Sequence, residues 1–511
     1  MRYRIAPNHD QSGNSLAEKW KSAVRGTVTF ALALAFCVSL IPDVAQAIPP
    51  EEPACKFYWQ PNLGVACGKH ELDLKISSRV RTEFWDAFMG QTDTFVGIRS
   101  RIGMRYNYDE AVVLFGEFQD ARVYEIGPFP SGAGALYRRF GGSSTPTKAK
   151  SSRMRQYWAE IRPIEGLSLR GGRQDIKLGT QAMYKEGNWK YLKVKRASQR
   201  LVGTVGWTNV ERSNDAAVIS YDWNGYNFYG FAGKPTTGVF DHVTAYRSQS
   251  DIVYGGLSVT AKRGTWFENT EIRPFFLGYN DDRPIRDGGL PKEVEVYTLG
   301  VSAIGIYPLG PGNLDVLLWG AGQAGAYNGA THLAYAAILE AGYQLTDVWS
   351  KPWLRFGVNF ASGDSGNNTN RHNTFFNMLP TNHLYYGFAD TLAFQNLVDI
   401  VVQLMFKPHD MLSVNVMFHQ FYMAKSADAQ YFGTGAFNKK IFGYGANATG
   451  GNNNFGQEID VIANLKLHKH LSVQGGYSHL WGSDVIRFIR NETGRSKKDL
   501  DFGYIQVAVN Y

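Results

Sequence analysis

Two neighbouring stretches, residues 72–84 and 95–106, alternate apolar and polar residues almost without a break. In the first stretch Leu72, Leu74 and Ile76 occupy every second position, with charged residues between them. Successive side chains of a β-strand point to opposite faces, so each stretch has one apolar and one charged face. Such strands belong either to a soluble sheet with its charges in water or to a membrane barrel. In a barrel the apolar face meets lipid and the charged face lines the lumen.

Composition favours the barrel. The 511 residues include 55 glycines, 14% aromatic residues and only 19% charged residues, and no composition change marks a second domain. No run after residue 50 approaches the roughly 18–20 apolar residues that a membrane helix needs. The net charge of +8 is spread over the alternating strands, without a recognition motif, so we expect no nucleic-acid partner.

The N-terminus has the features of a secretory signal peptide. Lys19, Lys21 and Arg25 precede an apolar stretch, and Ala45-Gln46-Ala47 supplies the small-x-small cleavage pattern. We therefore expect cleavage before Ile48 and insertion into the outer membrane of a Gram-negative cell. The predicted parts are a signal peptide (1–47), a periplasmic N-terminal segment (48–70) and the outer-membrane β-barrel (71–511).

Two cysteines, Cys55 and Cys67, remain after this cleavage, both in the segment before the first strand. In an oxidising periplasm a disulfide that closes this short loop is the natural interpretation. A metal-binding pair is the less favoured alternative, because no complementary Cys or His spacing follows.

The spacing of turns fixes the number of strands. Nineteen candidate strands follow residue 70, but bacterial single-chain barrels have even numbers, with short periplasmic turns and long outer loops. The alternation of short and long connections becomes consistent when residues 200–209 join an outer loop, which leaves about eighteen antiparallel strands. The last strand ends on the aromatic Tyr511, as outer-membrane barrels commonly do. The predicted outer loops are rich in Gly, Asn, Ser and Tyr, as exposed loops should be. The loop that contains residues 200–209 is about 178–214, and the others are about 124–152, 234–249, 362–397, 423–456 and 482–500.

Face assignment places a set of arginines and two acidic residues in the lumen. An arginine wall opposed by few carboxylates would focus a strong field in a narrow pore. Guanidinium groups pair well with carboxylates, including those of uronic acids. Many porins carry arginine ladders whatever their solute, and Gly171-Gly172 leave the facing of the next residue open. The predicted pore-lining or substrate-path residues are Arg79, Arg81, Arg99, Arg101, Arg105, Arg170, Arg173, Arg355, Glu458 and Asp460.

Three motifs, in this order, resemble the alginate export family of outer-membrane barrels. They are Tyr157–Ile161 followed by Leu169–Gln174, then Phe376–Asp390 followed by Asn396-Leu397, and finally Gly456–Val461 followed by Leu471–Ser483. The resemblance spans about residues 70–511. It implies an 18-stranded barrel that passes an anionic polysaccharide, typically alginate, outwards through a basic constriction. The cysteine segment and the Gly/Asn-rich loop at 433–456 depart from the exporter.

Three functional hypotheses follow. The first is a monomeric channel that exports an anionic polysaccharide or related acidic solute, with outer-membrane lipid and periplasmic export proteins as partners. The second is an uptake porin for small anions such as sugar acids. The third, a barrel enzyme or loop receptor, lacks a nucleophile motif, so we expect no catalytic residue, no cofactor and no metal. Trp207 could stand at a lipid interface or stack on a pyranose ring.

Overall fold

The computed structural model describes residues 55–511 except 59–62, 88–90, 129, 141–147, 284–285, 288–289, 292, 367–369, 434–444 and 493–496. The chain divides into an N-terminal unit, Met1–Cys55, and the unit Lys56–Tyr511. The predicted signal peptide lies outside the described residues.

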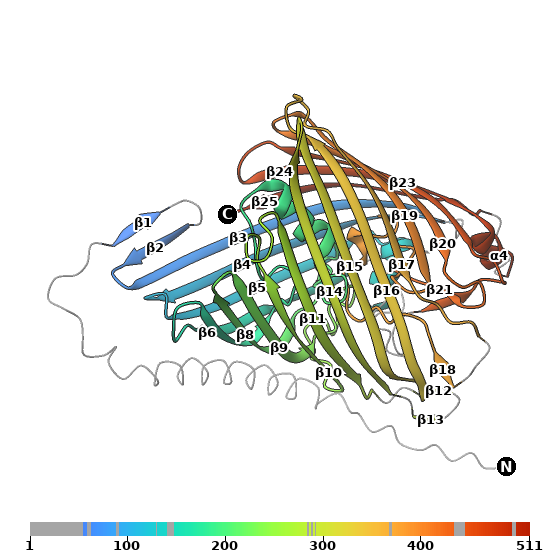
Figure 1. The fold of residues 1–511 in the computed structure, drawn as a ribbon, viewed down its shortest axis with the longest axis horizontal. Helices are drawn as coiled ribbons and strands as arrows, with labels where there is room; N and C mark the ends of the chain where they lie inside the picture. The colour runs from blue at the N-terminus through green and yellow to red at the C-terminus, as the bar shows by residue number, and fades with distance from the viewer. Residues whose placement is uncertain are drawn as a thin grey trace, which may run out of the picture. The chain divides into compact units, whose positions relative to one another are not determined.

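The second unit is a closed antiparallel barrel of eighteen strands (Figure 1). Each strand pairs with its neighbour, and the last strand pairs with the first, Val507 opposite Val80. The barrel strands are β3 (His70–Ala87), β4 (Gln91–Tyr108), β5 (Val112–Tyr124), β6 (Ala149–Ile161), β7 (Leu167–Gln174), β8 (Asn214–Trp223), β9 (Tyr226–Pro235), β10 (Ile252–Ala261), β11 (Thr270–Asp281), β14 (Val294–Leu309), β15 (Gly312–Tyr327), β16 (Ala330–Leu345), β17 (Trp353–Ala361), β19 (Leu397–His409), β20 (Leu412–Met423), β23 (Asn454–Lys466), β24 (Leu471–Gly482) and β25 (Leu500–Asn510).

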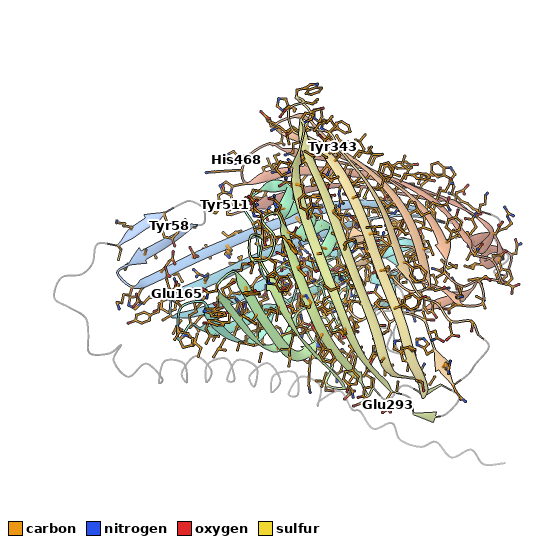
Figure 2. The ribbon with its side chains drawn as sticks, viewed as in Figure 1. Tyr58, Glu165, Glu293, Tyr343, His468 and Tyr511 are labelled. Atoms are coloured by element: carbon orange, nitrogen blue, oxygen red, sulfur yellow. The ribbon has the colours of Figure 1, made fainter. Side chains whose placement is uncertain are left out.

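The strand prediction is confirmed, including the assignment of residues 200–209 to a loop. Period-two alternation holds because lipid contacts every second side chain: on β14, Leu299 is 68% exposed, whereas its neighbour Thr298 is buried. The turn between β8 and β9 has positive φ angles of 43° at Asn224 and 84° at Gly225, as a type I′ hairpin requires. Figure 2 labels Tyr343 and His468 close to two short turns and Glu293 at the opposite end of the barrel.

A short hairpin, β1 (Lys56–Tyr58) and β2 (Leu63–Cys67), adds two strands to the sheet beside the start of β3. There β2 pairs antiparallel with the first five residues of β3, from Cys67 opposite His70 to Leu63 opposite Leu74. The Tyr58 hydroxyl donates a hydrogen bond of 2.7 Å to Asp73. Cys55 and Cys67 are both disulfide-bonded. That they bond to each other remains our proposal.

Among the described residues, no helix is long and apolar enough to cross a membrane. The remaining helices and short strands lie in the connections at the end of the barrel opposite the short turns. These elements are α2 (Gly132–Phe140), α3 (Gly187–Tyr191), the π-helix η1 (Leu192–Ala197), β12 (Arg286–Asp287), β13 (Leu290–Pro291), β18 (Arg371–His372), the 3₁₀-helix η2 (Asn382–Leu384), β21 (Ala429–Tyr431), β22 (Ala446–Ala448) and α4 (Asp484–Glu492).

Three connections that we expected to be exposed, about 178–214, 234–249 and 362–397, are instead largely buried, the second of them around Phe240 and His242. We call residues 175–213 the first inner segment and residues 362–396 the second inner segment. The two pair with each other: the Gly203 amide donates to the Leu379 carbonyl at 2.8 Å, and Leu379 donates to Leu201 at 2.8 Å. Both contribute to the main hydrophobic cluster, through Trp189 and Phe394 for example. The expectation of exposed loops is therefore wrong for these segments, because strand side chains satisfy their polar groups.

Candidate functional site

The arginines of β3 bind the backbone of the first inner segment. The Arg79 guanidinium donates to the carbonyls of residues 206, 207 and 208 at 3.0–3.2 Å. Arg81 donates to the Trp207 carbonyl at 2.9 Å and pairs with Glu83. Because a guanidinium carries five N–H donors in a fixed fork, two arginines can hold three successive carbonyls. The strand that carries the charged face thus fixes the course of the segment.

Three further arginines surround one carboxylate of the same segment, Glu211. Arg99 and Arg101 of β4 both contact its Oε1, Arg101 at 2.9 Å, and Arg155 of β6 approaches Oε2 at 3.4 Å. We call Arg99, Arg101 and Arg155 the arginine cradle. Burial alone would raise the pKa of Glu211, but the attraction of Arg101, Arg99 and Arg155 lowers it below its usual value. The cradle is therefore a site built to hold an ionised carboxylate.

Other side chains fix the cradle geometry. Arg155 forms a bidentate pair with Asp175 at 2.7 and 3.0 Å and donates to Glu117 at 2.6 Å. Arg101 donates through Nε to Gln119 at 2.6 Å. These contacts leave parts of the Arg99 and Arg101 guanidinium groups directed at Glu211. Bidentate and charge-assisted hydrogen bonds restrict orientation as well as adding energy, so the cradle is preorganised.

The first inner segment is strained at three positions. Gln199 has a φ of 59°, Val205 a φ of 55° and Glu211 a φ of 64°, in the left-handed region that L-residues rarely adopt. Each such conformation costs about 1–3 kcal/mol and persists only where the surroundings enforce it. At Glu211 the surroundings are the arginine contacts, and at Val205 the amide donates to the Thr381 hydroxyl at 3.1 Å. Loss of the arginine contacts would therefore favour a different course of the loop around Glu211.

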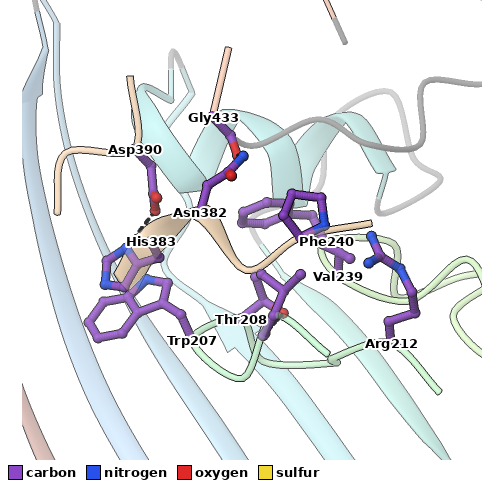
Figure 3. A pocket seen from close by; sticks show the side chains of 11 residues that line it. Trp207, Thr208, Arg212, Val239, Phe240, Asn382, His383, Asp390 and Gly433 are labelled. Atoms are coloured by element: carbon purple, nitrogen blue, oxygen red, sulfur yellow. Dashed lines mark hydrogen bonds and ion pairs between the residues drawn. The ribbon is translucent and has the colours of Figure 1, made fainter. Parts of the chain in front are cut away.

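Trp207 cannot stack on a sugar in this conformation. The Arg81 guanidinium lies 3.6 Å from the Trp207 ring centroid, and the His383 ring stacks on it at 4.0 Å. The cavity beside these rings (Figure 3), lined by Thr208, Asn382 and others, is about 20 Å³, room for one water molecule. Within it His383 bonds to Asp390 at 2.7 Å. Of the two predicted roles of Trp207, sugar stacking does not fit this arrangement.

A second ion-pair cluster anchors η1 to the barrel wall. The Glu340 carboxylate of β16 accepts hydrogen bonds from Arg196 at 2.7 and 2.9 Å and from Arg200 at 3.2 Å. It also accepts one from Arg355 of β17 at 2.8 Å. Arg355 also donates two hydrogen bonds, of 2.9 and 3.0 Å, to the Asp315 carboxylate of β15. One carboxylate thereby joins two residues of the inner segment to the wall.

The remaining predicted residues stand apart from the cradle. Arg105 pairs with Asp73 at 3.1 Å near the short-turn end, and Arg170 pairs with Glu160. Arg173 forms a bidentate pair with Asp215, both bonds 2.7 Å. Glu458 and Asp460 are fully buried on β23, next to the second inner segment. The predicted set is thus divided among several clusters.

The expectation that few carboxylates oppose the arginines is wrong. Among the described residues, the buried charged side chains comprise eleven Arg and Lys and thirteen Asp and Glu. Sequence reasoning missed Arg155, Arg196, Arg200, Glu211 and Glu340. A signal for Arg155 existed, because it lies on a predicted strand beside the first motif, but a bulge between β5 and β6 displaces its alternation. In the described part of the chain, no group of three or more His, Cys, Asp or Glu side chains is placed to hold a metal ion.

The barrel closure, the lipid-facing apolar side chains and the charged interior define a porin-like channel of the Gram-negative outer membrane. Solved structures share this fold. OccK2 (OpdF) of Pseudomonas aeruginosa in complex with glucuronate is 10% identical, with a TM-score of 0.55 over 86% of this chain and 97% of that chain. OccAB2 of Acinetobacter baumannii is 9% identical, with a TM-score of 0.55 over 86% and 98%. OpdK of P. aeruginosa is 8% identical, with a TM-score of 0.53 over 86% and 99%.

The profile of the alginate export family matches residues 70–501, so the chain belongs to that family. The resemblance found in the three sequence motifs is thereby confirmed. No curated protein matches the chain.

Proposed function

We propose that this channel passes uronate-type anions, with an acidic polysaccharide such as alginate as the leading cargo. The observation that carries the proposal is the arginine cradle, in which Arg99, Arg101 and Arg155 hold the Glu211 carboxylate. A uronate residue presents the same group on each sugar ring. We infer that a cargo carboxylate takes the place of Glu211 during passage.

The exchange is energetically feasible because it replaces one ionised carboxylate by another. No guanidinium is left unpaired in a buried site, which would cost about 3–5 kcal/mol. Departure of the segment also releases the strained φ angles at Val205 and Glu211. Stepwise passage needs sites that attract the cargo and then let it go. The competing Glu211 carboxylate would keep the affinity for any single uronate moderate.

An uptake route for small sugar acids is the second candidate. Its support is the glucuronate in the OccK2 structure, a protein with the same fold but only 10% identity. The cradle would bind a monomeric uronate by the same contacts. Length of the ligand therefore distinguishes the two candidates better than its charge does.

The test is single-channel recording in planar bilayers, with the reversal potential measured in a KCl gradient. We expect anion selectivity and block by oligo-uronates at concentrations at least tenfold below those needed for glucuronate. Replacing Arg99 and Arg101 by Gln should reduce both selectivity and block. Glu211→Gln should act in the opposite direction, because it leaves the cradle with one negative charge fewer.

Glu186→Gln is the matched control, since Glu186 is exposed and pairs with Arg263 outside the cradle. Equal block by monomer and oligomer would favour the uptake porin. Cation selectivity, or variants that shift block in the same direction at Arg99 and Glu211, would refute the assignment of the cradle to the cargo path.

A further inference from the structure

Four ionisable side chains form a cluster on three adjacent strands, away from the arginine cradle. Asp399 of β19, His419 of β20, and Glu458 and Asp460 of β23 are each 0% exposed. His419 Nδ1 bonds to Asp399 Oδ1 at 2.9 Å, and its Nε2 lies 3.8 Å from Asp460 Oδ2. Asn359 donates to the other Asp399 oxygen at 2.9 Å. Asp399 and Asp460 thus flank one imidazole and Glu458 stands opposite it on the next strand, so the cluster holds more acid than base.

Glu458 and Asp460 lie two residues apart on β23, so their side chains share the inner face of this strand. Glu458 Oε2 and Asp460 Oδ2 both lie buried and find no hydrogen-bond donor among the described residues. An ionised carboxylate can only accept hydrogen bonds, so one of these two carboxyl groups can donate to the other only if it carries a proton. Two adjacent ionised carboxylates in a buried site would repel each other strongly, and such pairs elsewhere share one proton.

The same two carboxyl groups hold the second inner segment. The Ala389 amide donates to Glu458 Oε1 at 2.9 Å, and the Phe388 amide lies 3.4 Å from Asp460 Oδ1. Gly387 has a φ of 81°, and a Cβ there would stand 2.5 Å from Glu458 Oε1. Glycine therefore allows the backbone to approach the carboxyl pair. Residues 387–389 therefore lie directly on the pair.

We propose that Glu458 and Asp460 share one proton, and that this proton latches residues 387–389 of the second inner segment to the barrel wall. Its loss leaves two adjacent carboxylates, with Asp399 and Asp390 nearby and the His419 imidazole beside them. The repulsion is relieved when the segment withdraws and water enters. Docking should weaken by up to tenfold for each pH unit once the proton is lost.

Among the described residues, no arginine or lysine forms an ion pair with Glu458 or Asp460 in the contacts that the structure shows. Other polar or charged groups near the cluster, among the described residues, are Ser478 of β24, which stands opposite Asp460, Tyr504 of β25, and Arg196 and Arg200 of the first inner segment. Both arginines are already bonded to Glu340. The latch therefore titrates as a carboxyl pair with a histidine beside it.

Three variants of the full-length mature barrel test the latch. Glu458→Gln and Asp460→Asn each supply an amide donor in place of the shared proton. Asp501→Asn is the control: it changes another aspartate that bonds a histidine, His479, but contacts neither inner segment among the contacts described. The first measurement is hydrogen exchange at the amides of 388 and 389 from pH 6 to pH 9, corrected for intrinsic exchange. Infrared spectroscopy then reports a protonated carboxylic acid at neutral pH.

We expect wild-type protection to fall at least tenfold across this range and KCl conductance to rise with it. In Glu458→Gln and Asp460→Asn, amide protection and conductance should not change with pH, and the infrared band of the protonated acid should be absent. Asp501→Asn should behave like wild type. Equal pH dependence in all four proteins, or no acid band in wild type, would overturn the proposal. If either Glu458→Gln or Asp460→Asn fails to insert into the membrane, the remaining variant and the infrared band of the wild-type protein still test the proposal. Because KCl carries the current, the result does not depend on the cargo.

Discussion

Glu340 offers the sharpest test of how the barrel wall holds the first inner segment. Its carboxylate and all three of its arginine partners are no more than 2% exposed. Glu340→Gln preserves the shape but leaves Arg196 and Arg200 as buried cations without their carboxylate. Removing one partner of a buried ion pair costs about 3–5 kcal/mol. Each hydrogen bond to a charged group contributes about 1.5–3 kcal/mol, so the sum over all bonds to Glu340 would exceed this cost. The sum is not the expected loss, because the energies of bonds within one network are not additive.

The loss should fall on docking of η1 rather than on the barrel. The strand ladder of β16 with β15 and β17 is made of backbone bonds that the substitution does not touch. A loss of about 3–5 kcal/mol shifts the docking equilibrium by two to three and a half orders of magnitude. Hydrogen exchange at residues 192–200 should accelerate accordingly, up to the limit set by wild-type docking, and single-channel conductance should rise.

Asp315→Asn provides the matched control. Asp315 is equally buried, on the next strand, and binds Arg355 and the Trp353 indole but makes no described contact with the inner segment. We expect this variant to lower barrel stability without faster exchange at η1. If Glu340→Gln leaves exchange at 192–200 unchanged, or if Asp315→Asn has the same effect, the anchor assigned to Glu340 is refuted.

Two further predictions concern other parts of the molecule. Burial lowers the pKa of His242, in the connection between β9 and β10, from 6.5 to about 4. Its neutral form is favoured when folded, so the stability of this connection should fall as pH drops from about 6.5 toward 4. His242→Phe should abolish that dependence in hydrogen exchange of residues 238–247, and a persistent dependence would contradict the assignment. On the lipid face, Leu299→Lys should cost about 2–4 kcal/mol in urea unfolding from vesicles. Leu309→Lys at the strand end should cost at most about 1 kcal/mol, and equal costs would contradict the assumed depth.

The strands were predictable from the sequence because lipid imposes a local rule. Every second residue of a barrel strand must be apolar, and the rule is visible within a few residues, as around Leu72 and Ile102. The same alternation predicted that Arg79, Arg81 and Arg355 lie on the buried face, where the structure places them. Parity of short and long connections then excluded a strand at 200–209.

The burial of the inner segments could not be predicted in this way. Arg196, Arg200 and Glu211 look like solvated loop residues, because their partners are far away in the sequence. Glu340 is 144 residues from Arg196, and Arg99 is 112 residues from Glu211. No local pattern encodes such pairs. The aromatic residues Trp189 and Trp207, unusual in an exposed loop, were the nearest local indication.

The distribution of charge bears on how a filled lumen would admit the proposed cargo. An apolar plug would be held by buried area alone, and its removal would expose that area to water. Here the Glu211 carboxylate and the carbonyls of residues 206–208 occupy arginine positions that an anionic cargo could occupy in turn. The anchor at Glu340 is different, because no anion can replace a carboxylate that belongs to the wall. We therefore expect passage to shift residues 203–212 while η1 stays docked, so cargo should accelerate exchange in the former and leave the latter protected. Equal acceleration of both would mean that the whole first inner segment leaves as one unit.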